Sequence, residues 1–326
     1  MPMRIGAFSG AILGLCCLVT SAAAQDRPVL EAAVLEFGTV NWELTTIREN
    51  GLDEARGFDL EVRGVASGSA GEIAFQGGAV DVIVSDWLWV ARQRAAGKDF
   101  VFIPYSTAVG GVMVAGDSPA ETLADLAGGK IGIAGGPLDK SWLIVQAYAR
   151  QVLDMDLVAE TEQVFGAPPL IYKTATSGEL DGAINYWHYM AKMEAAGMRK
   201  LVDIADAAEA LGLDPDTPLL GYVVKGELVR ENPDLIRGLA AASRDAKALL
   251  AEDDAAWDAL RPAMNAENDA EFEALKQGFL AGVPKPGPVD EEEVDKMLRF
   301  MAESGGDALV GDADSLPEGT FFDPAS

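Results

Sequence analysis

Buried-strand and helix patterns alternate through the first hundred residues of the chain. Residues 29–37 are a nearly continuous apolar run, which predicts a buried strand, and residues 42–50 predict a helix that ends at Gly51. Residues 58–65 alternate apolar and polar positions, as a half-buried strand does. The other helices and strands predicted in this region lie at residues 67–76, 80–84, 87–96 and 100–105. This alternation is typical of a parallel sheet flanked by helices.

The middle of the chain continues the pattern between two extended segments, residues 109–115 and 219–224. A capping box, Ser118-Pro119-Ala120-Glu121, predicts a helix that ends at Gly128. A strand at residues 130–134 and helices at 142–153 and 168–177 follow. Asn232-Pro233 starts a long helix, and the chain then stays helical and rich in alanine up to a loose tail at residues 317–320.

Two stretches a hundred residues apart, 78–97 and 178–197, are similar to each other. They align without a gap and are identical at seven of twenty positions, where roughly one or two matches would arise by chance. Both read as a turn, a short apolar strand, a polar-aromatic loop and a helix. The shared Asp81 and Asp181 precede the strands, so we interpret them as structural. A long period seen twice predicts two similar lobes rather than a solenoid.

We therefore predict an α/β fold of two lobes, each a mixed, mainly parallel sheet flanked by helices, joined by two crossover strands. The predicted boundaries are residues 25–112 and 221–326 for lobe 1 and residues 113–220 for lobe 2. Ligands of open α/β sheets bind at the carboxyl ends of the strands. The two polar-aromatic loops are expected to face each other across a cleft and to clamp a small molecule.

Residues 1–24 are typical of a cleaved signal peptide. Arg4 supplies a positive charge, residues 12–19 a short apolar core, and Ala22-Ala23-Ala24 a small-residue cleavage site. An uncleaved anchor is the alternative, but the apolar run is short for a membrane span. Cys16 and Cys17 both lie inside this segment, and neither has the preceding small residue that lipidation needs. We expect an exported, periplasmic protein without disulfides.

Composition and motifs exclude several classes of function. The net charge of −27 argues against nucleic-acid binding through a basic face. No phosphate-binding loop, dinucleotide motif or nucleophile elbow occurs in the sequence. His188 is the single histidine, and no residues have zinc or EF-hand spacing, although carboxylates alone leave calcium open. We expect no cofactor, no metal and no catalytic residues.

Aromatic and small polar residues recur where strands lead into helices. Trp42, Trp87, Trp142 and Trp187 each lie at or just before a predicted helix start. Each alone is typical of a core residue, but the recurrence predicts an aromatic wall that stacks a planar or cationic ligand, at about 0.5–1.5 kcal/mol per contact. Small polar residues at these junctions either bind a ligand or simply cap helices: Asn41, Ser67, Ser69, Ser85, Asp86, Asn185 and Tyr186. His188 follows Trp187 and is interpreted either as a polar rim residue or as a ligand contact.

Several segments resemble the nitrate/sulfonate/taurine-type periplasmic substrate-binding proteins, a group that also resembles the binders of thiamine-pyrimidine precursors. These segments are residues 41–43, 49–62, 78–82, 177–183 and 225–239. The resemblance covers most of residues 29–245. It implies a type II periplasmic binding protein fold, in which a solute is closed between two lobes and delivered to an ABC permease and its ATPase in the inner membrane.

The resemblance also implies which positions hold the solute: Asn41, Trp42, Ser67, Ser69, Ser85, Asp86, Gly135, Ser141, Asn185 and Trp187. Trp87, Tyr186 and His188 complete the predicted ligand-binding set. Anion binders often add a basic group in the cleft, and Lys140 is the clear candidate here. Asp86 and the aromatic residues fit a heteroaromatic or amine-bearing solute at least as well.

The predicted function is that of a monomeric solute-binding protein without enzymatic activity. One alternative is an enzyme on the same fold, similar to the pyrimidine-precursor synthases; the signal peptide and the single histidine argue against it. The other alternative is a periplasmic sensor or protein-interaction module that presents the same clamp to a protein partner.

Overall fold

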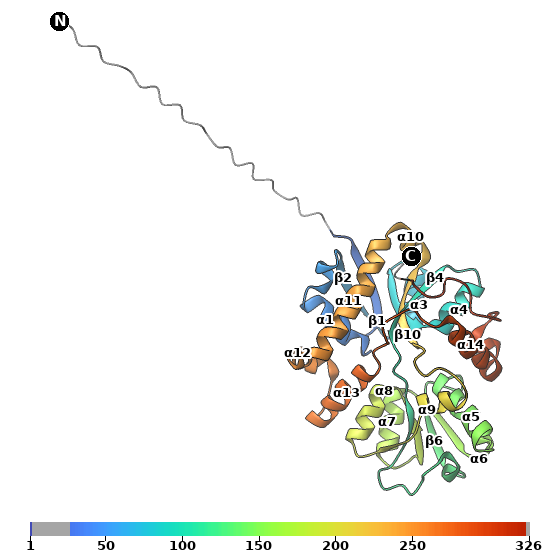
Figure 1. Ribbon diagram of the computed structural model, residues 1–326. Coiled ribbons are helices and arrows are strands. Elements are labelled where there is room, and N and C mark those ends of the chain that lie inside the picture. The colour runs from blue at the N-terminus through green and yellow to red at the C-terminus, as the bar shows by residue number, and fades with distance from the viewer. Residues whose placement is uncertain (2–26, 324–326) are drawn as a thin grey trace.

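The computed structural model describes residue 1 and residues 27–323, and it divides the chain into two lobes, each with its own five-stranded sheet (Figure 1). The signal-peptide prediction for residues 1–24 falls, apart from Met1, outside the described residues. Within the described part, no helix combines the length and apolar character needed to cross a membrane.

The sheet of lobe 1 has the strand order β2-β1-β3-β10-β4. Its strands are β1 (Val29–Leu35), β2 (Asp59–Val65), β3 (Val82–Asp86), β4 (Phe100–Ser106) and β10 (Leu220–Lys225). β1 is parallel to β2 and β3, whereas β10 is antiparallel to β3 and β4. β10 therefore comes from much later in the chain and lies between two strands of the first hundred residues.

The sheet of lobe 2 has the order β7-β6-β8-β5-β9. Its strands are β5 (Gly111–Val114), β6 (Lys130–Ala134), β7 (Glu162–Gly166), β8 (Gly182–Ile184) and β9 (Arg199–Asp203). β6 is parallel to β7 and β8, and β5 is antiparallel to β8 and β9. Position by position this order matches that of lobe 1, which confirms the predicted fold of two similar, mainly parallel lobes.

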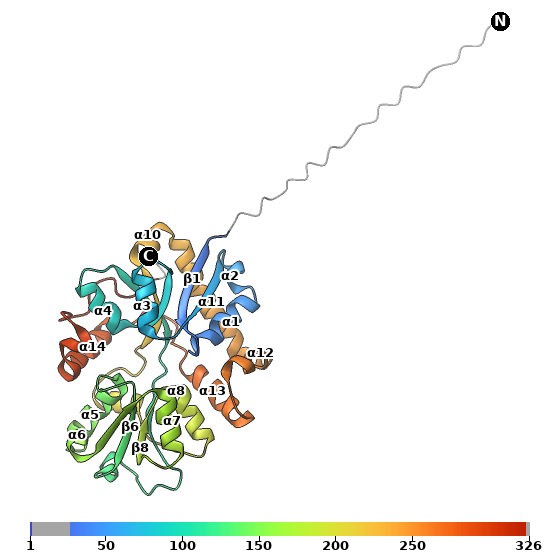
Figure 2. The same cartoon turned by 180° about the vertical axis from the view of Figure 1, so that it is seen from behind.

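Helices cover both faces of the two sheets, and the last ones pack beside lobe 1 and against lobe 2 (Figures 1 and 2). The helices are α1 (Val40–Glu49), α2 (Leu52–Ala55), α3 (Gly68–Gln76), α4 (Trp87–Ala95), α5 (Lys140–Val152), α6 (Leu157–Glu160), α7 (Pro168–Thr176), α8 (Trp187–Ala195), α9 (Ile204–Ala210), α10 (Gly226–Glu231), α11 (Pro233–Glu252), α12 (Asp254–Met264), α13 (Asp269–Ala281), α14 (Glu291–Gly305) and α15 (Asp307–Val310). α13 packs on α8 and α14 on α5, so the C-terminal helices touch both lobes.

The internal repeat occupies equivalent positions in the two lobes, as β3–α4 and β8–α8. Gly78 and Gly178 both have positive φ angles, 75° and 79°, which favour glycine. The Asp81 carboxylate accepts a hydrogen bond from the backbone N–H of Glu31 in β1, and the Asp181 carboxylate accepts one from Lys130 in β6. Each aspartate thus ties a repeat strand to the neighbouring parallel strand, which confirms the structural role predicted for both.

The helix predicted after Ser118 differs from the structure. Residues 119–128 do not form an α-helix: after Pro119 the chain makes only a short 3₁₀ turn, Leu123–Leu126, with a capping box of Thr122 and Asp125. The Asp125 carboxylate accepts the N–H groups of Glu121 and Thr122, so a side chain satisfies these backbone donors locally and the pattern is that of a turn. The two segments predicted to be extended, residues 109–115 and 219–224, do form strands: they contain β5 and most of β10, each of which belongs to a sheet.

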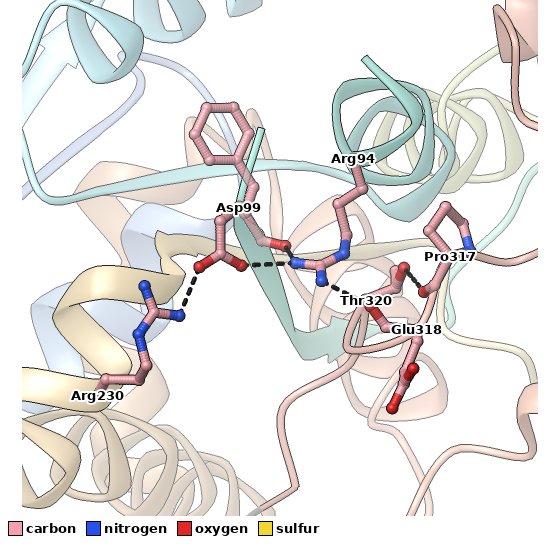
Figure 3. A network of polar contacts seen from close by, with 7 residues as sticks. Arg94, Asp99, Arg230, Pro317, Glu318 and Thr320 are labelled. Carbon is pink, nitrogen blue, oxygen red and sulfur yellow. Dashed lines mark hydrogen bonds and ion pairs between the residues drawn. The ribbon is translucent and has the colours of Figure 1, made fainter. Parts of the chain in front are cut away.

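The tail predicted to be loose is instead bound to the edge of lobe 1. The Phe102 N–H in β4 donates to the Thr320 carbonyl, the Phe102 carbonyl accepts the Phe322 N–H, and Thr320 is fully buried. Arg94 donates to the carbonyls of Phe100 and Glu318 and pairs with Asp99 (Figure 3). The tail covers backbone groups that an edge strand would otherwise expose.

Candidate functional site

The carboxyl ends of the parallel strands of the two lobes face each other. Asp86 at the end of β3 forms an ion pair with Lys140, which follows β6 in the other lobe. Trp42, which follows β1, packs edge-on against Trp187, which follows β8, with ring centroids 5.9 Å apart. Two contacts between loops at these ends place the candidate site between the lobes, at the edges where open α/β sheets bind ligands.

The ion pair between Asp86 and Lys140 is held by the starts of two helices. Asp86 caps α4, because one carboxylate oxygen accepts the Trp89 N–H at 2.8 Å, and its other oxygen lies 2.6 Å from Lys140 Nζ. Lys140 is the first residue of α5, which Asp139 caps through the Trp142 N–H. The side chains of Asp86 and Lys140 are 20% and 30% exposed, so both are reachable from solvent.

Electrostatics keep this pair charged. Burial alone would raise the pKa of Asp86, but the attraction and hydrogen bond of Lys140 outweigh it and lower that pKa. Burial would lower the pKa of Lys140, and Asp86 raises it instead. Burial and then repulsion by Asp86 raise the pKa of Glu72 on α3, while burial raises that of Asp139. The ammonium group therefore lies among several carboxyl groups.

Most of the expected aromatic wall is buried in the cores of the lobes. Trp42, Trp87 and Trp142 are only 4%, 0% and 2% exposed. Because their indoles pack under the sheets and helices, they leave little ring surface for a stacked solute in this conformation. Trp187 is half-buried, lying between Trp42 and Gly278 of α13.

Residues around β8 form the lobe 2 wall of the site. Tyr186 is 44% exposed, and a Cβ on Gly135 would lie 3.7 Å from its hydroxyl, so these two predicted residues are neighbours. Asn185 is buried; its amide donates to the Pro168 carbonyl and its side-chain oxygen accepts the Tyr186 N–H. His188 is half-buried in the first turn of α8, and burial followed by repulsion from Lys192 lowers its pKa to about 4.

The remaining predicted residues lie at helix starts. Asn41 donates to the carbonyls of Leu35, Glu36 and Gly38, so its amide organises the loop after β1. Ser67 caps α3 by accepting the Ala70 N–H. Ser69 in the first turn of α3 is exposed, whereas Ser85 and Ser141 are half-buried beside Asp86 and Lys140 in the chain.

Exposed apolar side chains at the same strand ends were not predicted from the sequence. Leu35 is the last residue of β1 and Phe37 follows that strand, and they are 44% and 80% exposed. The others are Ile73 on α3, Leu138 before α5, Phe165 at the end of β7 and Leu170 on α7. An isolated apolar residue in a loop carries no distinctive pattern, and only the sheet topology shows that Leu35, Phe37, Leu138 and Phe165 lie at the carboxyl ends of strands.

A cavity of about 480 Å³ lies at the hinge rather than between Asp86 and Lys140. The two segments in which the chain passes between the lobes both line this cavity, with Thr107–Val109 and Pro215–Asp216. Residues of α8 and α13 line it as well. Of the predicted site residues, Trp187 lines it. Among the described residues, no group of histidine, cysteine or acidic side chains has the arrangement of a metal site.

Several solved structures share this fold. The periplasmic aliphatic sulphonate binding protein SsuA of Escherichia coli is 19% identical, with a TM-score of 0.69 over 88% of this chain and 95% of that one. The alkanesulfonate-binding protein SsuA of Xanthomonas axonopodis pv. citri, bound to MOPS, is 16% identical, with a TM-score of 0.66 over 92% and 99%. A mutant of the desulfurization enzyme DSZB, in complex with biphenyl-2-sulfinic acid, is 19% identical, with a TM-score of 0.59 over 90% and 98%.

The family assignment comes from the sequence itself. No curated protein matches the chain. The family model described as NMT1/THI5 like matches residues 39–256, which is more than half of the chain. The chain therefore belongs to the NMT1/THI5-like family.

Proposed function

We propose that this protein is a periplasmic solute-binding protein, which captures a small organic solute between its lobes and delivers it to an ABC importer. The observation that carries the proposal is the meeting of matching strand ends from two sheets around an ion pair, Asp86 with Lys140. The signal-peptide pattern of residues 1–24 and the transport role of similar structures support the location and the partner.

The proposed mechanism is hinge closure. Two chain crossings join the lobes, and both line the hinge cavity, so rotation at Thr107–Val109 and Pro215–Asp216 would change the distance between the facing strand ends. A solute that contacts both lobes stabilises the closed state by the difference between its binding free energies for the closed and the open state. The sulfonate ligands of the similar structures suit Lys140, and a heteroaromatic or amine-bearing solute suits Tyr186 and Asp86.

An enzymatic role has less support. Both cysteines lie at positions 16 and 17, inside the predicted signal peptide, so residues 25–326 contain no thiol nucleophile. His188, the single histidine, lies among the rings of Tyr186, Trp187 and Tyr189, and burial lowers its pKa to about 4. The likeness to a desulfurization enzyme is one of fold.

The proposal is tested by binding and closure together. We expect residues 25–326 to bind a solute from a panel of alkanesulfonates, amines, amino acids and pyrimidines, or from a periplasmic extract of the native host. A ligand at about a hundred times its dissociation constant should raise the free energy of unfolding by about 2.7 kcal/mol. Small-angle scattering should show contraction with the same ligand.

As a control, any ligand that co-purifies with the protein is released by heating, removed by dialysis and identified by mass spectrometry. The same panel is then applied to the ligand-free protein. Absence of binding from the panel and the extract would contradict the proposal. Chemical turnover of a bound molecule would instead favour the enzyme alternative.

A further inference from the structure

The hinge cavity is a second space, besides the candidate site, at which residues of both lobes meet. Its volume of about 480 Å³ is within the range of pockets that hold small molecules. Its lining includes Trp187 but neither Asp86 nor Lys140. A molecule bound there would therefore occupy a different place from a solute held by that ion pair.

Two helix faces form much of the cavity wall. α8 and α13 lie side by side, and the lining residues of each follow the spacing i, i+3, i+4 and i+7, so one face of each helix borders the cavity (Figures 1 and 2). The α8 face consists of Trp187, Met190, Ala191 and Glu194. The α13 face consists of Ala274, Gln277, Gly278 and Ala281. Short side chains on α13 opposite a ring and a thioether on α8 leave a largely apolar space, which suits the hydrocarbon part of a ligand.

The charged side chains around the cavity are mainly acidic. Those that line it are Glu194, Lys200, Asp203 and Asp216. Lys200 is paired with Asp203, with 2.7 Å between Nζ and Oδ2, and Asp216 is paired with Lys285 from the segment after α13. Each lysine near the cavity therefore already has a carboxylate partner.

More distant groups add to the negative charge. Burial alone would lower the pKa of Lys200, but the hydrogen bond to Asp203 and then the charges of Asp203, Glu194 and Asp206 raise it. Asp214 is a second acidic neighbour of Lys285. The lining and its nearest charged neighbours thus contain five carboxylates and two ammonium groups.

Glu194 is the lining carboxylate without a direct partner. No hydrogen bond or ion pair of its side chain is found in the described part of the chain, and its interaction with Lys200 is at longer range than that of Asp203. Lys192, on the same helix, is paired with Glu271 of α13. A positive charge in the cavity would supply the partner that Glu194 lacks, whereas an anion would meet a surplus of negative charge.

We propose that the hinge cavity binds a small organic cation, an ammonium ion with an apolar body. Its charge lies beside Glu194, and its body lies between the facing sides of α8 and α13. The indole of Trp187 adds a ring surface of the kind that attracts cations.

The bound cation should restrain the hinge. Thr107–Val109 and Pro215–Asp216, from the two segments in which the chain passes between the lobes, line the cavity, so rotation of the lobes changes its shape. A ligand that fits the present shape favours the arrangement of the lobes that provides it. This consequence rests on the proposed function: the cation should reduce the contraction that a solute in the cleft produces.

The first experiment measures cation binding without any cleft solute. The probes are butylamine, benzylamine and phenethylamine, each compared with the alcohol and the carboxylate of the same carbon skeleton. Titration calorimetry with residues 25–326 should show at least about tenfold tighter binding of an amine than of its alcohol, and no binding of the carboxylate. Equal affinities for the three charge types, or no binding of any amine, would overturn the inference.

Two variants locate the site. Glu194→Gln keeps the length of the side chain but removes its charge, and should lower the amine affinity at least about tenfold. Ala274→Leu fills the cavity from α13 and should abolish amine binding although Glu194 is intact. Glu303→Gln is the matched control, because Glu303 is an exposed glutamate of α14 that does not line the cavity, and it should leave the affinity unchanged. Circular dichroism of each variant separates loss of binding from loss of folding.

A third variant separates the hinge from the cleft. Asp86→Asn removes the carboxylate of the candidate site and should keep the amine affinity of the parent protein. Loss of amine binding in Asp86→Asn together with unchanged binding in Glu194→Gln would place the cation in the cleft and overturn the inference.

The last experiment tests the restraint of the hinge. Small-angle scattering should show a smaller contraction with a cleft solute when the amine is present at saturation. An unchanged contraction would refute the restraint and leave the cation site standing. If no cleft solute is found, the solute-binding proposal fails, while calorimetry with the amines still decides whether the cation site exists.

Discussion

Glu43 is a fully buried carboxylate at the centre of lobe 1. One oxygen accepts hydrogen bonds from the Tyr222 hydroxyl at 2.7 Å and from the Ser243 hydroxyl at 2.6 Å, and the other pairs with Lys247. The Lys247 ammonium also lies 4.7 Å from the ring centroid of Tyr105. These contacts join α1, β10 and α11, so a charge that is costly to bury is fully surrounded by donors.

Removing the cation from this cluster should destabilise the protein strongly. In Lys247→Met the Glu43 carboxylate keeps its hydroxyl donors but loses its counter-charge, and we expect a loss of about 3–5 kcal/mol in the free energy of unfolding. Urea unfolding followed by circular dichroism measures it. Lys130→Met is the matched control, because Lys130 and Glu162 are 51% and 62% exposed and their pair should contribute less than about 1 kcal/mol. Equal losses in the two variants would refute the argument.

His188 should contribute to the acid sensitivity of folding. Its pKa is lowered from 6.5 to about 4 in the folded protein, first by burial and then by Lys192, so the unfolded chain binds its proton at higher pH than the folded chain. The neutral imidazole therefore contributes up to about 3 kcal/mol to the free energy of unfolding. This contribution is present above about pH 6.5 and is lost as the pH falls towards 4.

The measurement is urea unfolding at several pH values between 4 and 7, for the parent and for His188→Gln. Carboxyl groups titrate in both proteins, so the difference between the two curves isolates the imidazole. The parent should lose more stability than the variant on acidification. Parallel curves would show that the imidazole takes up its proton at the same pH in the folded and the unfolded protein, which would contradict the lowered pKa.

At the scale of single residues, the sequence indicates polarity and position but not burial. Asp81 and Asp181 were recognisable as structural because they precede the strands in both copies of the repeat, and both bind a neighbouring strand. The tryptophans were recognisable as recurrent, yet three of them are buried, because whether an indole points into a core depends on packing between distant segments. The partnership of Asp86 with Lys140 is likewise a long-range contact, which no local pattern reports.

Among the elements, α8 and α13 form the contact that holds the two lobes together on the hinge side. Lys192 of α8 lies 2.5 Å from Glu271 of α13 and donates to the Asn265 carbonyl at 2.9 Å. Gly278 of α13 lets the Trp187 ring approach, since a Cβ at this position would lie 2.8 Å from two of its carbon atoms. This glycine is needed for a close approach between lobes.

Gly278→Ala should therefore destabilise the protein although alanine favours helices. Helix propensity alone would stabilise by about 1 kcal/mol, but overpacking against Trp187 should cost about 1–3 kcal/mol. Thermal unfolding of the single and double variants measures the coupling. With Trp187→Leu in the background, the smaller side chain should accept the methyl group, and the alanine should become neutral or stabilising. A stabilising effect in the parent background would contradict the close contact.

The start of α11 was predictable from local residues. α11 begins at Asn232-Pro233 as expected, although the Asn232 side chain makes no capping hydrogen bond, so the proline at the first helical position is the local signal. The helix expected after Ser118 does not form, because its cap signal is followed by a turn that ends at the adjacent Gly128-Gly129. A capping motif marks where a helix can begin, while its continuation depends on an apolar face that packs against a neighbour.

At the scale of the whole molecule, the similarity of two mainly parallel lobes could be predicted from the repeat and from the alternation of strands and helices, whereas their common strand order comes from the structure. The interpretation of residues 25–112 with 221–326 as one lobe and 113–220 as the other remains a prediction about boundaries. In the structure β5 starts at Gly111 and β10 at Leu220, so the chain passes from one sheet to the other close to those positions.

Folding should begin in lobe 2. Its five strands are contiguous, from Gly111 to Asp203, whereas β10 of lobe 1 must insert between β3 and β4. Contacts between near segments close smaller loops and form sooner. Pulse-labelled hydrogen exchange during refolding should protect the amides of β6 and β8 before those of β3 and β4. Simultaneous protection of all four strands would rule out this order.

The place of β10 has a consequence for how the chain acquires its shape after synthesis. Until residues 220–225 arrive, β3 and β4 have no backbone partner between them, and their ladder groups stay bonded to water. The half of the cleft that carries Asp86 is then unfinished, whereas the half that carries Lys140 can already be assembled. A chain synthesised only as far as the end of lobe 2 would thus hold the Lys140 half of the site without the Asp86 half, and the ion pair between the lobes would form only after β10 has inserted.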